Sequence, residues 1–287
     1  MRASRRFHVA AVAELLLGVP TVLSSLLFVA VLGRAVSQDK WWVFPVVWLV
    51  SGAIVFVLAT DRVLAALVHR LRKPTRTESA ALQPLLEDVC ATAGVDPRRY
   101  WLRIQNSREI NAMAVGGHVV GVSTAALGLP REQLEAVLAH EIGHHLAGHT
   151  MISLVRWWYE LPARTVILVV VLAGAVVLRI GQVLGGTATV VSRVVVVALG
   201  IAAVLASPWL LLVPVIAPLV ALTSRRAELH ADRVAAELGY GPRLLEVLQR
   251  WIREGHDDIR ARAGLRARML ASHPSCAQRI TRLQRKG

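Results

Sequence analysis

The sequence predicts a mainly α-helical, multi-pass membrane protein with four transmembrane helices and a small β-sheet. The 287-residue chain is 55% hydrophobic and has a mean hydropathy of +0.51, which is too apolar for an ordinary soluble domain. Its apolar residues gather in four long stretches, enough to cross a bilayer core of about 30 Å. A metal-binding pattern, His-Glu-Ile-Gly-His at 140–144, lies between the second and third stretches.

The first two stretches cover residues 9–33 and 42–68 and are nearly free of charge. Asp61 and Arg62 interrupt the second stretch near its end, where such a pair is tolerated at the membrane surface or against protein. Residues 4–7, Ser-Arg-Arg-Phe, resemble a twin-arginine export signal. Because the first stretch is longer than the apolar region of a usual signal peptide, we expect an uncleaved anchor instead.

The third and fourth stretches cover residues 166–184 and 194–222. Arg179 interrupts the third, but a long basic side chain near a helix end can reach the membrane surface. The fourth has no charge and contains three prolines, which we expect to bend its helix. These prolines are Pro208, Pro214 and Pro218.

The distribution of charge predicts an orientation in the cell membrane. The chain has 33 Lys and Arg against 19 Asp and Glu, a net charge of +14. Basic residues gather before the first stretch and after the second and fourth, whereas loops 34–41 and 181–193 are poorer. Since cytoplasmic loops carry the excess of Lys and Arg, the N-terminus, residues 70–163 and the segment from 223 are predicted to be cytoplasmic. The basic residues flanking the first two stretches are Arg2, Arg5, Arg6, Arg70, Arg72, Lys73 and Arg76.

The same charge could favour nucleic acid, but no nucleic-acid module is recognisable, so a lipid bilayer is the expected partner. Cys90 and Cys276 fall in segments predicted to face a reducing compartment. We therefore expect neither a disulfide nor a thiol ligand.

The pattern at 140–144 points to a zinc site. Residues four apart on an α-helix differ by about 40° in direction, so His140 and His144 can offer two imidazoles to one ion. Glu141 would lie beside the ion and act as a general base toward water. The alternative is a solvated helix face with two histidines. Pro130 and Glu132 favour a helix start, and one apolar side favours an internal helix. That side comprises Leu134, Val137, Leu138 and Ile142.

A third ligand is expected because catalytic zinc usually has three protein ligands and an open position. Glu228 and Asp232 share a helix face, so Glu228 could bind the ion while Asp232 orients a ligand histidine. The alternative is an amphipathic, solvated helix. His144 and Glu228 can meet only if the chain between them crosses the bilayer an even number of times, and the third and fourth stretches supply two crossings.

Three other histidines are less suitable ligands. On the zinc helix, His145 and His149 point about 140° and 180° away from His140, and His230 points about 200° from Glu228. We assign all three to packing or surface roles.

Four segments together resemble the M48 family of membrane metallopeptidases, which has HtpX-like and Ste24-like (CAAX prenyl protease) branches. These segments are Asn-Ala-Met-Ala-Val-Gly at 111–116, His-Glu-Ile-Gly-His-His-Leu-Ala-Gly-His-Thr at 140–150, Glu228 to Asp232, and Ser-His-Pro at 272–274 with Arg279 and Ile280. The four-span plan resembles the HtpX-like branch. One departure is Ala227, where many relatives carry arginine, which leaves Arg225 or Arg226 as candidates for its orienting role.

The resemblance implies a gluzincin site with one Zn²⁺ per chain, held by His140, His144 and Glu228, with Glu141 as general base. Residues 111–124 read as a short hairpin or edge strand, whose Asn111 and Ala112 could bind an extended substrate. A core hairpin is the alternative.

His273 could polarise a developing oxyanion or occupy the open zinc position; alternatively, it is a helix-start residue packed by Pro274. Arg279 is expected to pair with Asp232 in a supporting role.

The sequence thus predicts two N-terminal transmembrane helices in 1–69, a transmembrane hairpin in 164–222, and a cytoplasmic zinc peptidase domain made from 70–163 and 223–287. The predicted function is a membrane-embedded zinc endopeptidase. The HtpX resemblance implies membrane or misfolded proteins as polypeptide substrates. A Ste24-like prenyl-peptide protease and a non-catalytic zinc-binding scaffold or sensor are the alternatives.

Overall fold

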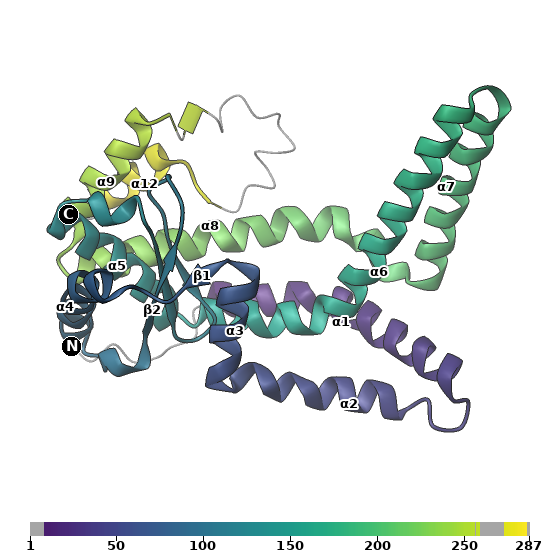
Figure 1. The fold of residues 1–287 in the computed structure, drawn as a ribbon, viewed down its shortest axis with the longest axis horizontal. Helices are drawn as coiled ribbons and strands as arrows, with labels where there is room; N and C mark the ends of the chain where they lie inside the picture. Colours follow the sequence, from purple (N-terminus) through teal and green to yellow (C-terminus); the bar gives the residue numbers. More distant parts are fainter. Residues whose placement is uncertain (1–8, 256, 259–272, 286–287) are drawn as a thin grey trace. The chain divides into compact units, whose positions relative to one another are not determined.

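The computed structural model describes residues 9–255, 257–258 and 273–285 (Figure 1). The basic residues at 2, 5 and 6, the segment 4–7 and Ser272 therefore lie outside the described residues. Within the described part the chain is mainly helical, with one four-stranded mixed sheet. The mainly α prediction with a small sheet is confirmed at this level.

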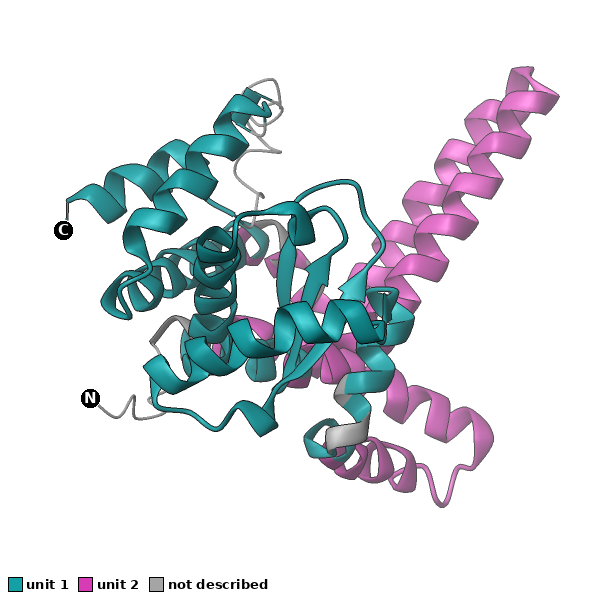
Figure 2. Cartoon of the chain, turned by 60° about the vertical axis from the view of Figure 1, so that its left-hand side comes forward, with its two compact units in different colours: residues 1–15, 54–154, 217–287 teal, residues 16–53, 155–216 magenta. Residues whose placement is uncertain are grey.

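The chain divides into two compact units, which Figure 2 shows in different colours. Unit 1 comprises residues 1–15, 54–154 and 217–287, and unit 2 comprises residues 16–53 and 155–216. Long helices pass from one unit into the other.

Unit 2 consists of helices whose apolar side chains are largely exposed. It contains most of α1 (Val9–Val36), α2 (Val43–Ser51), most of α6 (His149–Leu184), α7 (Gly186–Ala206) and the 3₁₀ segment η4 (Pro208–Leu212). Helices α6 and α7 run side by side and are joined at Gly185, whose φ of 67° suits glycine (Figures 1 and 2). Within the described residues, three segments are long and apolar enough to cross a membrane, namely Val12–Val36, His149–Leu184 and Gly186–Ala206.

Two of the predicted spans are not continuous helices. The stretch 42–68 is divided into α2, η1 (Gly52–Phe56) and α3 (Leu58–Val68), with Val57 extended between them. The stretch 194–222 is divided between α7 and α8 (Val213–Glu237) at Ser207. Because a residue before proline is pushed out of the helical region, Pro208 accounts for the break at Ser207.

The predicted loop 181–193 is also wrong, because helix continues on both sides of Gly185. Arg179 lies on α6 and is exposed. The two candidate spans between His144 and Glu228 are therefore α6 and α7. Their number is even, as the proposed ligand set requires, although their boundaries differ from the predicted ones.

The sheet of unit 1 has the strand order β1-β2-β4-β3. Its strands are β1 (Leu71–Arg72), β2 (Trp101–Gln105), β3 (Ala112–Val115) and β4 (Val119–Ser123). Strands β2 and β4 are parallel, and the two outer pairs are antiparallel. The segment 111–124 is thus a hairpin, in which β3 lies at the edge of the sheet.

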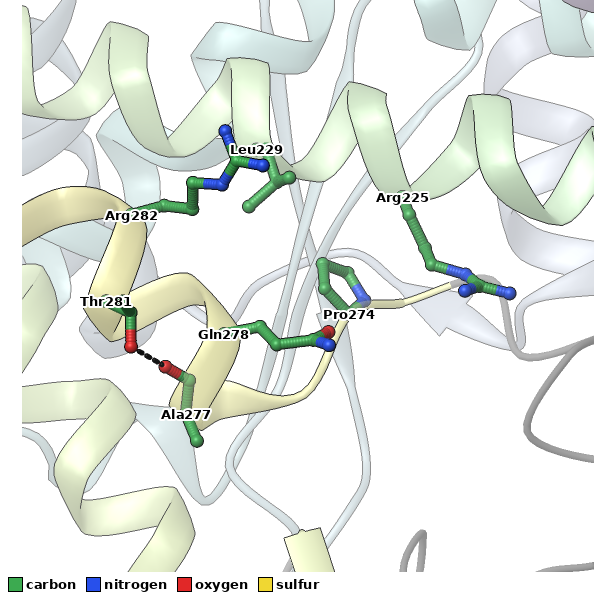
Figure 3. Close-up of a pocket in the computed structure, with 7 residues that line it drawn as sticks. All are labelled: Arg225, Leu229, Pro274, Ala277, Gln278, Thr281 and Arg282. Atoms are coloured by element: carbon green, nitrogen blue, oxygen red, sulfur yellow. Dashed lines mark hydrogen bonds between the residues drawn. The ribbon is translucent and has the colours of Figure 1, made fainter. Parts of the chain in front are cut away.

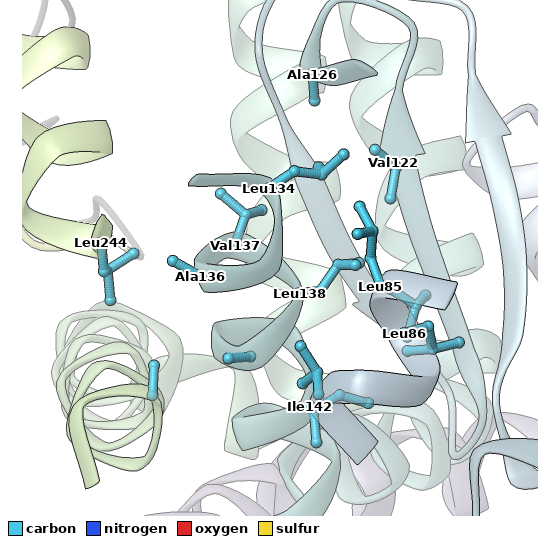
Figure 4. Close-up of a cluster of buried hydrophobic side chains, with 14 of the residues drawn as sticks. Leu85, Leu86, Val122, Ala126, Leu134, Ala136, Val137, Leu138, Ile142 and Leu244 are labelled. Atoms are coloured by element: carbon cyan, nitrogen blue, oxygen red, sulfur yellow. The ribbon is translucent and has the colours of Figure 1, made fainter. Parts of the chain in front are cut away.

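Helix α5 (Arg131–Leu146) lies in the main core of unit 1 (Figure 4). It begins directly after Pro130, as predicted, and its apolar side is buried, including Leu138 and Ile142 at 0% exposure. These side chains share one buried cluster with Leu86 of α4 (Arg76–Ala93) and Leu244 of α9 (Gly241–Arg253). Burying this much apolar surface fixes the face of α5 that remains for polar residues.

The last described helix, α12 (Cys276–Gln284), packs against α9. Its first N–H groups are bound by the Ser275 side chain and by the Asp257 carboxylate, which accepts from Cys276 N at 2.8 Å and Ala277 N at 3.0 Å. Such caps stabilise the start of a short helix. Cys90 and Cys276 are buried free thiols.

Candidate metal centre

Three side chains from two helices converge in unit 1. His140 Nε2 lies 3.5 Å from Glu228 Oε2, and His144 Nε2 lies 3.4 Å from Glu228 Oε1. One ligand atom from each of the three residues lies within 4.8 Å of the others. Among the described residues, this is the group of His, Cys, Asp and Glu side chains that could hold a metal ion.

A close approach of α5 and α8 brings these side chains together. A Cβ atom on Gly143 would lie 3.1 Å from both Cα and O of Ala231. Small residues on α8 follow at helical spacing, since Ala227, Ala231 and Ala235 are all buried. The helices can therefore approach with little between their backbones, and Glu228 lies opposite the two histidines.

Asp232 and Arg279 fix the orientation of His140. Its Nδ1 donates to Asp232 Oδ1 at 2.9 Å, which leaves Nε2 as a lone-pair donor on the side of Glu228. Arg279 binds Asp232 with two hydrogen bonds, at 2.8 Å from Nε and 2.6 Å from a terminal nitrogen. The same arginine lies 3.7 Å from Glu228 Oε2, so α12 supplies a charge that touches both acids.

The electrostatics of this network favour a cation. Burial opposes the charge of Asp232, but Arg279 and His140 together outweigh burial and lower the Asp232 pKa to about 2. Burial likewise opposes the charge of Glu228, yet its hydrogen bonds to His140, His144 and His273 hold its pKa well below the usual range. Burial and Arg279 disfavour a proton on His140, whereas Asp232 and Glu228 raise its pKa to about 10. The negative charge that favours a proton there would equally favour a metal cation.

The donor set also fits a divalent metal by distance. Zinc binds imidazole nitrogen and carboxylate oxygen at about 2.0–2.2 Å, which places neighbouring ligand atoms of a tetrahedron about 3.4 Å apart. The two His–Glu distances of 3.4 and 3.5 Å match that separation. Two nitrogens and one oxygen with an open fourth position are typical of catalytic zinc.

Glu141 follows His140 on α5 and is 6% exposed. Its direction on the helix differs from that of His140 by about 100°, so it lies beside the converging ligands rather than among them. A carboxylate in this position has access to a reacting water without using its oxygens to bind the ion.

His273 lies next to Glu228 rather than away from the site. Its Nδ1 is 3.0 Å from Glu228 Oε1, and its side chain is 71% exposed. The hydrogen bond with Glu228 raises the pKa of His273, against a smaller effect of burial. It precedes the α12 cap at Ser275, so it is not itself the residue that starts the helix.

The three histidines assigned to packing or surface roles, His145, His149 and His230, lie outside the group that could hold a metal. His145 is buried with its Nε2 3.0 Å from Val119 O and its Nδ1 3.2 Å from Thr150 Oγ1. His149 is also buried, and His230 is half-buried.

Asn111 and Ala112 lie where β3 begins. Asn111 N donates to Ser123 Oγ at 3.0 Å, and Ser123 N donates to Asn111 O at 2.9 Å, which ties the start of β3 to the end of β4. Since β3 packs against α5, its hairpin borders the helix that holds both histidines.

A pocket lies between α8 and α12 (Figure 3). It is lined by Arg225, Leu229, Pro274, Ala277, Gln278, Thr281 and Arg282. Arg225 lines this pocket, and Arg279 contacts Glu228. Sequence reasoning missed this second contact of Arg279 and the close helix approach at Gly143; the glycine inside the metal-binding pattern was the available signal for the latter.

Two imidazoles one turn apart, a carboxylate from a second helix and a glutamate beside them are typical of metal-dependent hydrolases. A family model, Peptidase family M48, matches residues 76–286. The chain therefore belongs to peptidase family M48. It is similar to proteins named Protease HtpX homolog from Neisseria meningitidis serogroup C and Neisseria gonorrhoeae, each 30% identical over 193 residues. These matches cover 63% of this chain and 64% of each relative.

Proposed function

We propose that this chain is a membrane-embedded, zinc-dependent endopeptidase that degrades damaged or misfolded membrane proteins. The observation that carries the proposal is the convergence of His140, His144 and Glu228 beside Glu141. Membership of the M48 family supports peptide hydrolysis. The similarity to proteins named Protease HtpX homolog supports the HtpX-like branch, and the quality-control role is part of this proposal.

His140, His144 and Glu228 would hold the metal. Bound zinc supplies Lewis-acid chemistry, which polarises the scissile carbonyl and lowers the pKa of water. Glu141 accepts the proton of the attacking water and returns it to the leaving amine. Asp232 keeps His140 in the tautomer whose Nε2 is free to bind, and Arg279 keeps Asp232 in place. His273 would stabilise the developing oxyanion or alternate with water at the open position, since it already reaches Glu228.

The edge strand β3 would hold an extended substrate through main-chain hydrogen bonds, with Asn111 and Ala112 at its start. Such binding selects for extended backbone more than for particular side chains. Damaged membrane proteins offer unpaired segments of this kind, whereas folded proteins do not.

The distribution of Lys and Arg supports a catalytic unit and an N-terminus that face the cytoplasm of a multi-pass cell-membrane protein. Membrane helices in the same chain would keep the enzyme close to membrane substrates. Cysteine-scanning accessibility in intact cells tests this orientation, and labelling of a cysteine at Arg98 only from the outer face would contradict it.

The central experiment compares the purified chain with its Glu141→Gln variant. Both are stripped of metal with a chelator, reloaded with one equivalent of zinc and incubated with casein and with an unfolded membrane protein. Since Glu141 is not a ligand, the variant should keep one zinc per chain. Its cleavage rate should fall by about 10²–10⁴-fold, the usual worth of a general base.

Two outcomes would change the assignment. If both forms bind one zinc and neither cleaves a polypeptide, the chain is a zinc-binding scaffold or sensor. If the wild-type chain cleaves only prenylated CAAX peptides, the specificity is Ste24-like and the quality-control role is wrong.

A further inference from the structure

An arginine pair lies on the side of the sheet away from the main core. Arg62 of α3 lies with its guanidinium carbon 3.7 Å from the ring centre of Trp101 on β2. Arg103 is two residues further along β2 and therefore faces the same side of the sheet. The His118 ring adds a second aromatic contact, 5.7 Å from Trp101. We call Arg62, Trp101 and Arg103 the arginine cluster.

Helix α3 covers this side of the sheet. Its Ala65 is fully buried in a small cluster with Leu71, Val115 and Val119, against which Trp101 packs. The alternate residues of β2, such as Ile104, point into the main core instead. The arginine cluster is thus held by packed elements of unit 1.

The described structure pairs neither positive charge of the cluster with an acid. Among the described side chains, no carboxylate forms an ion pair with Arg62 or Arg103; their recorded contacts are the Trp101 ring and the carbonyl of Leu102. Burial and the charge of Arg62 lower the pKa of Arg103. Two guanidinium groups that repel each other in this way would be stabilised by an anion that contacts both of them.

The outer face of α3 is apolar. Val63 is 53% exposed and Leu67 is 75% exposed. On a helix these residues point about 160–200° away from the buried Ala65, so they face outward together. The chain reaches α3 directly from the apolar segment Val43–Phe56. A short helix with exposed apolar residues after such a segment is suited to the boundary between headgroups and acyl chains.

We propose that Arg62, Trp101 and Arg103 bind the phosphate of an anionic phospholipid, whose acyl chains lie along Val63 and Leu67 of α3. The two guanidinium groups donate hydrogen bonds to the phosphate oxygens in the planar geometry that arginine favours. Trp101 holds the Arg62 guanidinium plane by cation–π contact, and tryptophan is a residue type that favours the membrane interface. A soluble phosphate would use the charges but not the adjoining apolar face, so the ligand is a lipid.

The test is a lipid titration of the full-length chain in detergent, followed by native mass spectrometry. Phosphatidylglycerol and phosphatidylcholine serve as the anionic and zwitterionic probes. The wild-type chain should retain phosphatidylglycerol at least about ten-fold more tightly than phosphatidylcholine, and Arg62→Gln/Arg103→Gln should reduce this preference to about two-fold or less.

Arg98→Gln/Arg99→Gln is the matched control, since it removes the same charge from two exposed arginines of the 3₁₀ segment Pro97–Arg99 in unit 1. It should keep the wild-type preference. If the control and the cluster variant lose it equally, binding depends on overall charge and the proposed site is wrong. Retained preference in the cluster variant would also overturn the proposal.

Thermal unfolding separates lipid binding from a structural role. Phosphatidylglycerol should raise the unfolding temperature of the wild-type chain but not that of Arg62→Gln/Arg103→Gln. In phosphatidylcholine alone, the variant should unfold at the same or a higher temperature, because the repulsion between the arginines is removed. Earlier unfolding there, with no response of the wild-type chain to phosphatidylglycerol, would show that the cluster only holds α3. Chelator-treated protein is used throughout, so the result is independent of peptidase activity.

Discussion

The two units bury polar groups in different ways. In unit 1, Asp232, Arg279, His140 and Glu228 form one network whose members come from three helices far apart in the sequence. Unit 2 also contains neutral polar contacts between segments far apart in the sequence, such as the hydrogen bond from Ser207 Oγ to Ser24 Oγ at 2.7 Å. On helix α6, Glu160 forms ion pairs with Arg156, one turn before it, and with Arg164, one turn after it.

The surfaces of the two units also differ in how many large apolar side chains they expose. Unit 2 exposes large apolar side chains, for example Leu205 at 78% and Val183 at 77%. Such a surface is suited to lipid. In lipid, single hydrogen bonds between helices contribute little to the free energy of unfolding. Unit 1 instead concentrates its buried charge where chemistry is proposed. Mutations that remove one polar partner should therefore have large effects in the charged network of unit 1 and a small effect at the neutral Ser24–Ser207 contact of unit 2.

The largest effect is expected from Glu228→Ala, which removes one of the three converging ligands. We expect zinc content to fall from one per chain to nearly none and peptidase activity to disappear, because two imidazoles alone bind the ion too weakly. Metal analysis after dialysis measures this loss. Glu237→Ala, on an exposed position of the same helix, should retain its zinc.

Arg279→Met should be the most destabilising change in the network. It leaves the buried Asp232 carboxylate without its arginine partner, which typically costs about 3–5 kcal/mol of the free energy of unfolding. Chemical denaturation in detergent measures the cost, with the exposed Arg282→Met on the same helix as control. A loss of less than about 1 kcal/mol would mean that the network resembles a surface ion pair.

Low pH should weaken unit 1 through Asp232. Its pKa in the folded chain is about 2, below the ordinary value of about 3.9 for an unfolded chain. The ionised carboxylate therefore stabilises the fold above about pH 4, and this stabilisation, about 2 kcal/mol, is lost as the pH falls through about 2. Denaturation at stepped pH should show a flatter profile for Asp232→Asn. Asp88→Asn, in an exposed ion pair, should leave the profile unchanged.

Gly143→Ala tests the close approach of α5 and α8. The added methyl group would meet the backbone of Ala231 at 3.1 Å, which should cost about 1–3 kcal/mol and weaken zinc binding by separating the helices. Gly128→Ala is a matched control, because a Cβ there meets nothing within 4 Å. Equal stability and zinc affinity of both variants would contradict this account of the site.

The smallest effect is expected in unit 2. Ser24→Ala removes the hydrogen bond with Ser207, and we expect a loss of about 0.6 kcal/mol, the average for such bonds between membrane helices. Denaturation under the same conditions as for Arg279→Met gives a direct comparison. A loss as large as that of Arg279→Met would remove the contrast between the units.

The sequence predicted the local parts of the site better than the helices around it. The spacing of His140 and His144 requires only helix geometry, and the apolar side of α5 identifies that helix. Glu228 also follows from spacing, once an even number of crossings is assumed. Hydropathy, in contrast, responds to composition and not to backbone direction, so it joined α2 to α3 across Val57 and α7 to α8 across Ser207.

Sequence patterns also could not predict the contacts between elements far apart in the chain. The pairing of Arg279 with Asp232 was expected from the family resemblance, but its contact with Glu228 depends on how α12 packs. The parallel pairing of β2 with β4, which leaves β3 at the edge, depends on a crossover that no local pattern specifies.

The position of Arg279 on the last described helix has a consequence for biosynthesis. His140 leaves the ribosome 139 residues before Arg279, a delay of roughly 7–28 s at ordinary rates of translation. Asp232 is made only 47 residues before Arg279, so for most of that interval a nascent chain holds His140 without either residue that orients it. The order of synthesis thus delays the assembled metal centre until the preceding apolar helices have already been made.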